Sequence, residues 1–135
     1  MEILRDAEDA PVDAHVLADD EHVRVAREVA EQLHAESGVE VEIVDLLTIS
    51  PLDRDTVAAS VRKTGRAVVV HEAPRSFGPG AEIAASIMEG AFLSLEAPVR
   101  RVTAHDLPFV GFARERANVP DVPRVLAACR ETLDF

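Results

Sequence analysis

The spacing of apolar positions changes several times along the chain, and each change predicts a new element. Residues 67–71, AVVVH, form a β-branched apolar run that is too short for a helix and lacks strict alternation. Such a run predicts a strand buried on both faces. Residues 81–95 then repeat apolar side chains at spacings of three and four, which indicates an amphipathic helix. The prolines and glycines of residues 74–80 predict the loop between them, completing half of a parallel βαβ unit.

The rest of the chain alternates in the same way. A weak strand pattern over residues 13–18 precedes a helical pattern that runs to about Ser37 and ends at Gly38. A second helix is expected to begin at Ser50, a capping residue followed by Pro51. The remaining predictions are strands at 39–47 and 99–103, a helix at 121–133 and an irregular stretch at 104–120. This order implies a mainly parallel sheet with helices on both faces, and the two arginines in the 99–103 strand place it near an edge.

Length and charge restrict the possible classes of protein. With 135 residues the chain is expected to form one domain, which we divide into a lead-in segment, 1–12, and a folded domain, 13–135. A net charge of −11 argues against nucleic-acid and anionic-membrane partners, because it repels phosphate groups. The chain has no long apolar run and no basic, hydrophobic leader, so we expect a cytoplasmic protein. The single cysteine, Cys129, lies on an apolar stripe and is interpreted as a core thiol.

Candidate chemistry lies at the carboxyl end of the central predicted strand. Ligands of open α/β sheets bind at this edge, so the candidate strand-end site consists of His71, Glu72, Arg75 and Gly80. Free N–H groups at the start of the next helix favour an anion, which makes a stand-alone small-anion binding module using the 72–82 loop an alternative function. A histidine in this position is nevertheless more often a hydrogen-bonded structural residue than a catalytic base.

The chain carries no motif for a metal centre or a hydrolase. It lacks paired cysteines, HExxH and GxSxG, and a metal site would require the His71–Glu72 pair to converge with His105–Asp106. We interpret His105–Asp106 as loop structure. No catalytic, cofactor-binding or metal-binding residues are assigned, and an independent enzyme using His71 and Glu72 is the least supported hypothesis.

Five ordered sequence blocks carry a resemblance to one family. They are DLLTISPLD at 45–53, SVRKTGR at 60–66, VHEA at 70–73, GAEIAA at 80–85 and APVRRVT at 97–103. Together they resemble the carboxyl-terminal domain of transketolase-like enzymes, most closely the beta subunit of the thiamine-diphosphate-dependent decarboxylase component of 2-oxo-acid dehydrogenase complexes. The resemblance implies a three-layer α/β/α sandwich with a mainly parallel, five-stranded sheet that contains one antiparallel strand. Because the pattern shows four strands, we place the fifth within residues 104–119.

The resemblance implies an assembly role, without catalysis by this chain alone. In the family, thiamine diphosphate and Mg²⁺ lie between two preceding domains, on a motif that begins with Gly-Asp-Gly, and that tripeptide does not occur here. We therefore expect no cofactor in this chain. The implied function is oxidative decarboxylation of pyruvate or branched-chain 2-oxo acids in the whole complex. The implied partners are the alpha and beta subunits of the decarboxylase component and the acyltransferase core, together with a possible homodimer.

The end of the chain is the implied partner-binding segment. In some relatives the terminus contacts the acyltransferase, and here Asp134 and Phe135 combine an apolar ring with carboxylates. Such a combination suits a basic partner surface. A frayed helix end is the equally weighted alternative.

Overall fold

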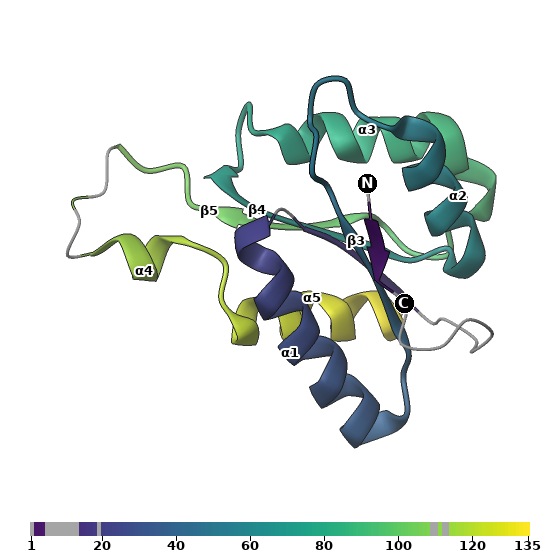
Figure 1. The fold of residues 1–135 in the computed structure, drawn as a ribbon. Coiled ribbons are helices and arrows are strands. Elements are labelled where there is room, and N and C mark those ends of the chain that lie inside the picture. The colour runs from purple at the N-terminus through teal and green to yellow at the C-terminus, as the bar shows by residue number, and fades with distance from the viewer. Residues whose placement is uncertain (1, 5–13, 19, 109–110, 112–113) are drawn as a thin grey trace.

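A computed structural model describes residues 2–4, 14–18, 20–108, 111 and 114–135 of the chain. The strands are β1 (Glu2–Leu4), β2 (Ala14–Ala18), β3 (Val41–Asp45), β4 (Ala67–Pro74) and β5 (Arg100–Ala104). The helices are α1 (Asp20–Ser37), α2 (Arg54–Thr64), α3 (Pro79–Ala91), the 3₁₀ turn η1 (Phe92–Ser94), α4 (Glu115–Asn118) and α5 (Val122–Leu133). Helices α1 and α5 cover one face of the sheet, and α2 and α3 cover the other (Figure 1).

The sheet has the order β1-β3-β2-β4-β5. Strands β2, β3, β4 and β5 run parallel, with Val16 of β2 in register with Ile43 on one side and Val68 on the other. The mainly parallel α/β architecture is therefore confirmed. The prediction that the strand after α3 lies near an edge is also confirmed, because β5 is the last strand of the sheet.

The fifth strand, which proves to be the antiparallel one, occupies a different place from the one predicted. It is β1, which pairs with β3 through Ile3 and Val44. We expected this strand within residues 104–119, but apart from Ala104, the last residue of β5, the described part of that stretch holds α4 and loop. Residues 2–4 were expected in the lead-in segment, and three residues are too few to display an alternating pattern. Residues 5–12 lie outside the described residues, and the boundary at residue 13 stays a prediction.

The core is divided into two apolar clusters by the sheet. Successive strand residues point to opposite faces, so Val16 faces α1 and α5 whereas Leu17 faces α2 and α3. Both side chains are fully buried. Cys129 of α5 belongs to the first cluster, and its burial raises the pKa of the thiol to about 12. The interpretation of Cys129 as an unreactive core thiol is confirmed.

Helix ends follow the capping rules, with one correction. Gly38 ends α1 in the left-handed region, φ 71°, and its N–H donates to the carbonyl of His34 at 2.8 Å. Helix α2 begins later than expected: Asp53 is its N-cap and accepts from the Thr56 N–H at 3.0 Å. The expected cap at Ser50 is therefore wrong, because the Asp53 carboxylate accepts from the free Thr56 amide in the first turn of the helix.

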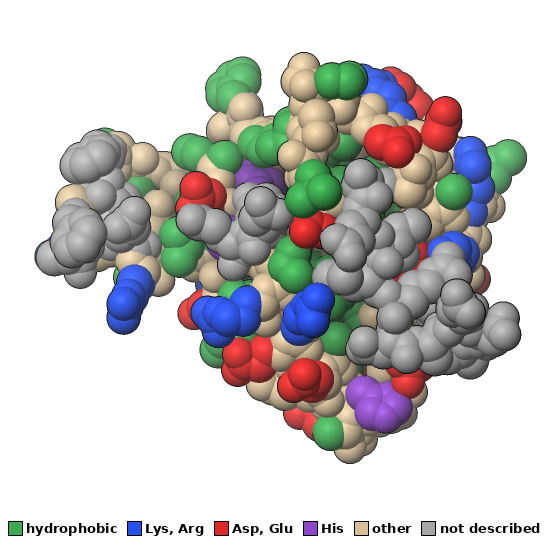
Figure 2. Space-filling view, in the orientation of Figure 1, with side chains coloured by type: hydrophobic (Ala, Val, Ile, Leu, Met, Phe, Trp, Pro, Cys, Tyr) green, Lys and Arg blue, Asp and Glu red, His purple; other side chains and the backbone are tan. Residues whose placement is uncertain are grey.

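Charged side chains are distributed over the visible surface, with acidic and basic groups interspersed (Figure 2). Within the part of the chain that the structure describes, no helix combines the length and the apolar character needed to cross a membrane.

One charged contact lies inside the fold. The Glu42 side chain on β3 is only 1% exposed, and its carboxylate accepts from Nζ of Lys63 at 2.8 and 2.9 Å. Ser60 donates to the same carboxylate at 2.9 Å. Because Lys63 and Ser60 belong to α2, this contact fixes the register of α2 on the sheet. Removing one partner of a buried ion pair is costly because the other charge stays in the interior.

We therefore expect Lys63→Met to lower the free energy of unfolding by about 3 kcal/mol, the lower part of the range for a broken buried pair, since the Lys63 side chain is 35% exposed. Urea denaturation followed by far-UV circular dichroism measures this change. The double variant Glu42→Leu/Lys63→Met is the control and should recover most of the loss. Equal stabilities of Lys63→Met and the wild-type chain would show that the pair contributes nothing.

Candidate functional site

The carboxyl end of β4 carries the predicted strand-end residues, and His71 lies at its centre. The ring is buried, with 4% of the residue exposed, and its Nε2 accepts a hydrogen bond from the Gly80 N–H at 3.1 Å. This bond requires a neutral ring whose Nε2 carries no proton. A Cβ added at Gly78 or Gly80 would collide with the same ring. The two glycines therefore allow the loop backbone to approach the imidazole closely.

A second contact fixes the loop between β4 and α3 to the residues after β5. The Asp106 carboxylate accepts from the Ser76 N–H at 2.8 Å and from the Ser76 hydroxyl at 2.7 Å. These hydrogen bonds, chiefly the backbone one, hold the pKa of Asp106 below its ordinary value, and the nearby Arg75 charge adds a smaller effect. The interpretation of His105–Asp106 as loop structure agrees with this role of Asp106.

Arg75 and Arg101 form a reciprocal pair across the same edge. The Arg75 guanidinium donates to the Arg101 carbonyl at 3.0 Å, and the Arg101 guanidinium donates to the Arg75 carbonyl at 3.3 Å. Glu72 follows His71 in the chain but is exposed. The structure thus brings His71 and Gly80 into direct contact, and it places Arg75 in a separate interaction with β5.

The carboxyl end of β4 therefore has few free polar groups that could bind a small ligand. The Gly80 N–H donates to His71, the Ser76 N–H donates to Asp106, and the Ala81 N–H donates to the Gly78 carbonyl at 3.2 Å. Pro79, the first residue of α3, has no N–H. An anion at a helix start is held by free N–H groups, and the N–H groups of Ser76, Gly80 and Ala81 already donate to other atoms of the chain.

An apolar groove of about 600 Å³ lies at the other end of α3. Its lining includes side chains from α3, from η1, from the segment before β5 and from the chain terminus: Met88, Phe92, Leu95, Glu96, Pro98 and Phe135. Three of the apolar groups are substantially exposed, Met88 at 45%, Phe92 at 58% and Phe135 at 71%. Large apolar side chains gathered in an open groove are typical of a protein-binding surface.

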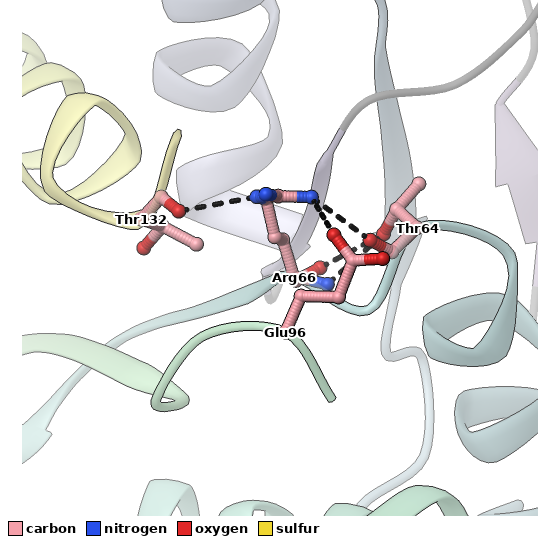
Figure 3. A network of polar contacts seen from close by, with 4 residues as sticks. All are labelled: Thr64, Arg66, Glu96 and Thr132. Carbon is pink, nitrogen blue, oxygen red and sulfur yellow. Dashed lines mark hydrogen bonds and ion pairs between the residues drawn. The ribbon is translucent and has the colours of Figure 1, made fainter. Parts of the chain in front are cut away.

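Arg66, immediately before β4, binds Glu96, one of the residues that line this groove (Figure 3). Its guanidinium donates to the Thr132 carbonyl of α5 at 3.2 Å and to the Thr64 carbonyl of α2 at 3.3 Å. It also pairs with the Glu96 carboxylate at 2.5 Å. The Glu96 N–H donates to the Gly65 carbonyl at 2.9 Å. One side chain thus connects the ends of α2 and α5 to the segment that lines the groove.

The predicted strand-end site and the groove that contains Phe135 therefore lie at opposite ends of β5. His71, Gly80 and Arg75 lie at the carboxyl ends of β4 and β5, whereas the groove lies beside Val99, just before the amino end of β5. Phe135 contributes to the groove, and Asp134 caps α5 with its N–H donated to the Arg130 carbonyl at 2.9 Å.

Comparison with known proteins agrees with this fold and identifies its family. Residues 12–125 match the transketolase C-terminal domain family. The chain belongs to that family. Two curated relatives, the pyruvate dehydrogenase E1 component subunit beta of Staphylococcus epidermidis and that of Staphylococcus aureus, are each 44% identical to it over 113 residues, 84% of this chain. The matched part is 34% of each relative, so the chain spans about a third of their length.

Two solved structures share the fold of this transketolase C-terminal domain. A protein described as "Split gene transketolase, inactive beta4 tetramer" has a TM-score of 0.73 and 26% identity, and the match covers 93% of this chain and 39% of that one. A 2-oxoglutarate:ferredoxin oxidoreductase from Magnetococcus marinus has a TM-score of 0.61 and 15% identity, covering 98% of this chain and 20% of that one. The second likeness shows the fold alone.

Sequence reasoning missed several residues that organise this transketolase C-terminal domain. Arg66 lies in the SVRKTGR block, but nothing in the sequence indicates its three partners, which lie on α2, on α5 and in the segment before β5. Met88 and Phe92 were assigned to the apolar stripe of the helix, because periodicity does not distinguish a buried face from an exposed groove. A usable signal for one of these contacts was Asp106. An aspartate in a loop commonly accepts from a backbone N–H, and here it accepts from that of Ser76.

The close approach of Gly80 to His71 leads to a test of the loop geometry. We expect Gly80→Ala to lower the free energy of unfolding by about 1–3 kcal/mol, because the new methyl group overpacks the imidazole. Guanidinium denaturation measures the loss. Gly111→Ala is the matched control, since a Cβ there meets nothing within 4 Å, and it should be nearly neutral.

A double variant tests the same contact. Gly80→Ala should destabilise the domain less in a His71→Ala background, because the ring that it meets is absent. Additive losses would mean that the imidazole is not what Gly80 avoids.

Proposed function

We propose that this chain is the partner-binding, C-terminal domain of the beta subunit of a thiamine-diphosphate-dependent 2-oxo-acid dehydrogenase. In the assembled enzyme it serves the oxidative decarboxylation of pyruvate or a branched-chain 2-oxo acid, in the cytoplasm. The observation that carries this proposal is the 44% identity to pyruvate dehydrogenase E1 beta subunits over 113 residues. The chain itself is proposed to be non-catalytic, and residues 13–135 are proposed as its folded domain.

The described residues do not fit a site for thiamine diphosphate and Mg²⁺. Among them, no group of three or more His, Cys, Asp or Glu side chains could hold a metal ion. The amides at the start of α3 donate within the loop or are absent, so no cradle for a diphosphate remains. We assign the cofactor to other parts of the parent enzyme. The same use of amides disfavours the small-anion binding module built on residues 72–82.

The apolar groove supports the partner-binding role. Its lining includes the exposed side chains of Met88, Phe92 and Phe135, and exposed carboxylates lie nearby in the sequence at Glu131 and at Asp134, beside Phe135. An apolar floor with acidic groups beside it complements a segment that carries an apolar side chain next to basic ones. We propose the acyltransferase core as the occupant of this groove and the alpha and beta subunits of the decarboxylase component as the other partners.

Association between copies of the chain is a further part of this proposal. The solved structure described as an inactive beta4 tetramer is 26% identical to this chain, and its description supports self-association of such subunits.

We expect Phe135→Ala to weaken binding of the chain to the acyltransferase core about tenfold, roughly 1.4 kcal/mol, because an aromatic anchor is removed from the groove. Isothermal titration calorimetry measures the dissociation constants. Leu93→Ala is the matched control, because Leu93 is 96% exposed and is not part of the groove lining, and it should bind as the wild-type chain does. If the wild-type chain binds neither the alpha subunit nor the acyltransferase core, the proposed function fails.

A further inference from the structure

Exposed apolar side chains occur on the loops that follow the carboxyl ends of three strands. Leu47 and Ile49 follow β3, Phe77 follows β4 and Leu107 follows β5. Ile49 is the least exposed of the four at 51%, and Phe77 is fully exposed. The three strands run parallel, so these loops leave the sheet on the same side. We call the surface that carries Leu47, Ile49, Phe77 and Leu107 the carboxyl-end face.

The fold separates the carboxyl-end face from a second exposed apolar region. Among the described residues, the other large apolar side chains of high exposure are Met88, Phe92, Leu93 and Phe135. They lie in the groove before the amino end of β5, or next to it in the sequence. Exposed apolar surface of this kind marks interfaces. The domain therefore has two candidate interfaces, one toward each end of the sheet.

A polar contact joins the loops after β4 and β5. Ser76 donates its N–H and its hydroxyl to the Asp106 carboxylate at 2.8 and 2.7 Å. Phe77 follows Ser76 in the chain and Leu107 follows Asp106, so the contact brings the two apolar residues to neighbouring positions. A surface that is fixed in this way loses little conformational entropy on binding.

Charges of both signs lie beside Phe77 on this face. Arg75 and Arg101 each donate to the other's backbone carbonyl, and the exposed carboxylates of Glu72 and Asp106 lie on the same side of the sheet. Mixed charges select neither an anion nor a cation, but they match the polar rim that surrounds the apolar core of a protein interface. The carboxyl-end face therefore fits a protein surface.

The direction of β1 indicates which protein surface lies there. Glu2 pairs with Asp45, Asp45 pairs with Ala18, and Ala18 pairs with Val70. This row lies at the carboxyl ends of β2 and β3, and β1 runs from it toward their amino ends (Figure 1). Leu47 is two residues from Asp45, a span of at most about 7 Å. A polypeptide joined to the start of β1 therefore enters the domain beside the carboxyl-end face.

The comparison with curated relatives supplies such a polypeptide. The matched part is 34% of each pyruvate dehydrogenase E1 beta subunit, and the matching family is a C-terminal domain. In those subunits the larger part of the chain therefore precedes the domain. Because a connection through β1 places that larger part at the carboxyl ends of the strands, the groove that contains Phe135 stays open to a partner from outside the subunit.

We propose that the carboxyl-end face is the docking surface for the preceding part of the beta subunit. The side chains of Leu47, Ile49, Phe77 and Leu107 are buried between the two parts. This inference rests on the proposed function and gives the two exposed apolar regions different partners. The carboxyl-end face holds the subunit together, whether the preceding part is joined to β1 or supplied as a separate chain, and the groove binds the acyltransferase core.

Engineered thiols test the proposal, because the native Cys129 is buried and its pKa is raised to about 12. Ile49→Cys and Phe77→Cys are made in the free chain and in a chimera, in which this chain replaces the matched part of the Staphylococcus aureus beta subunit. Maleimide labelling at each position is followed by peptide mass spectrometry. Labelling should be at least tenfold slower in the chimera than in the free chain, and equal rates overturn the proposal.

Leu93→Cys is the matched control, because Leu93 is 96% exposed and lies in η1, beyond the other end of α3. It should react at the same rate in the free chain and in the chimera. Slower labelling at Leu93 with unchanged labelling at Ile49 and Phe77 overturns the proposal. If the chimera does not fold, the same substitutions are made at the aligned positions of the intact Staphylococcus aureus subunit. Fast labelling at the positions aligned with Ile49 and Phe77 then overturns it.

Two further outcomes assign the carboxyl-end face to another occupant and also overturn the proposal. The first is protection in the free chain that increases with protein concentration, which indicates a second copy. The second is protection of the chimera that develops only when the alpha subunit is added. If the chimera protects neither thiol but the wild-type chain binds the acyltransferase core, this inference fails while the proposed function stands. If the wild-type chain binds neither the alpha subunit nor the acyltransferase core, the proposed function itself fails.

Discussion

Burial of the sheet on both faces is the constraint on which the rest of the structure depends. Val68, Val69 and Val70 in β4 are at most 2% exposed, and successive side chains enter opposite helix layers. Two helices lie on each face, and the described apolar residues of β2, β3 and β4 are buried beneath them, so these strands offer little open surface to a ligand or partner. Contacts have to be made at the ends of the strands or on the outer surfaces of the helices. The loop between β4 and α3 is one such position, and the apolar groove beside the later part of α3 is another.

The same constraint explains which parts of the fold could be predicted from the sequence. A strand buried on both faces reads as a continuous apolar run, so β4 was recognised from AVVVH, and the Gly38 stop of α1 was recognised from local backbone chemistry. Strand β1 was missed because three residues carry no periodic signal and its partner, β3, is about 40 residues away. The N-cap of α2 was misplaced because Ser50 and Asp53 are both good capping residues, and only the geometry of the turn selects between them.

The candidate site was less predictable than the fold, for a physical reason. The strand-end rule located His71 and Gly80 correctly at one edge, but sequence cannot show whether a polar group there is free or already used. Here the His71 Nε2 and the amides that an anion would need are engaged in holding the loop. The groove could not be predicted because Phe135 is about 40 residues from Met88 and Glu96 in the sequence, and only the fold brings the chain terminus beside α3.

Polar groups in this domain therefore act mainly to fix surfaces. Asp106 and His71 hold the loop between β4 and α3, Arg66 binds Glu96 in the lining of the groove, and Lys63 with Glu42 holds α2 on the sheet. Each donor or acceptor that rigidifies a surface is no longer available to a ligand, which is why the strand-end residues form few free polar groups.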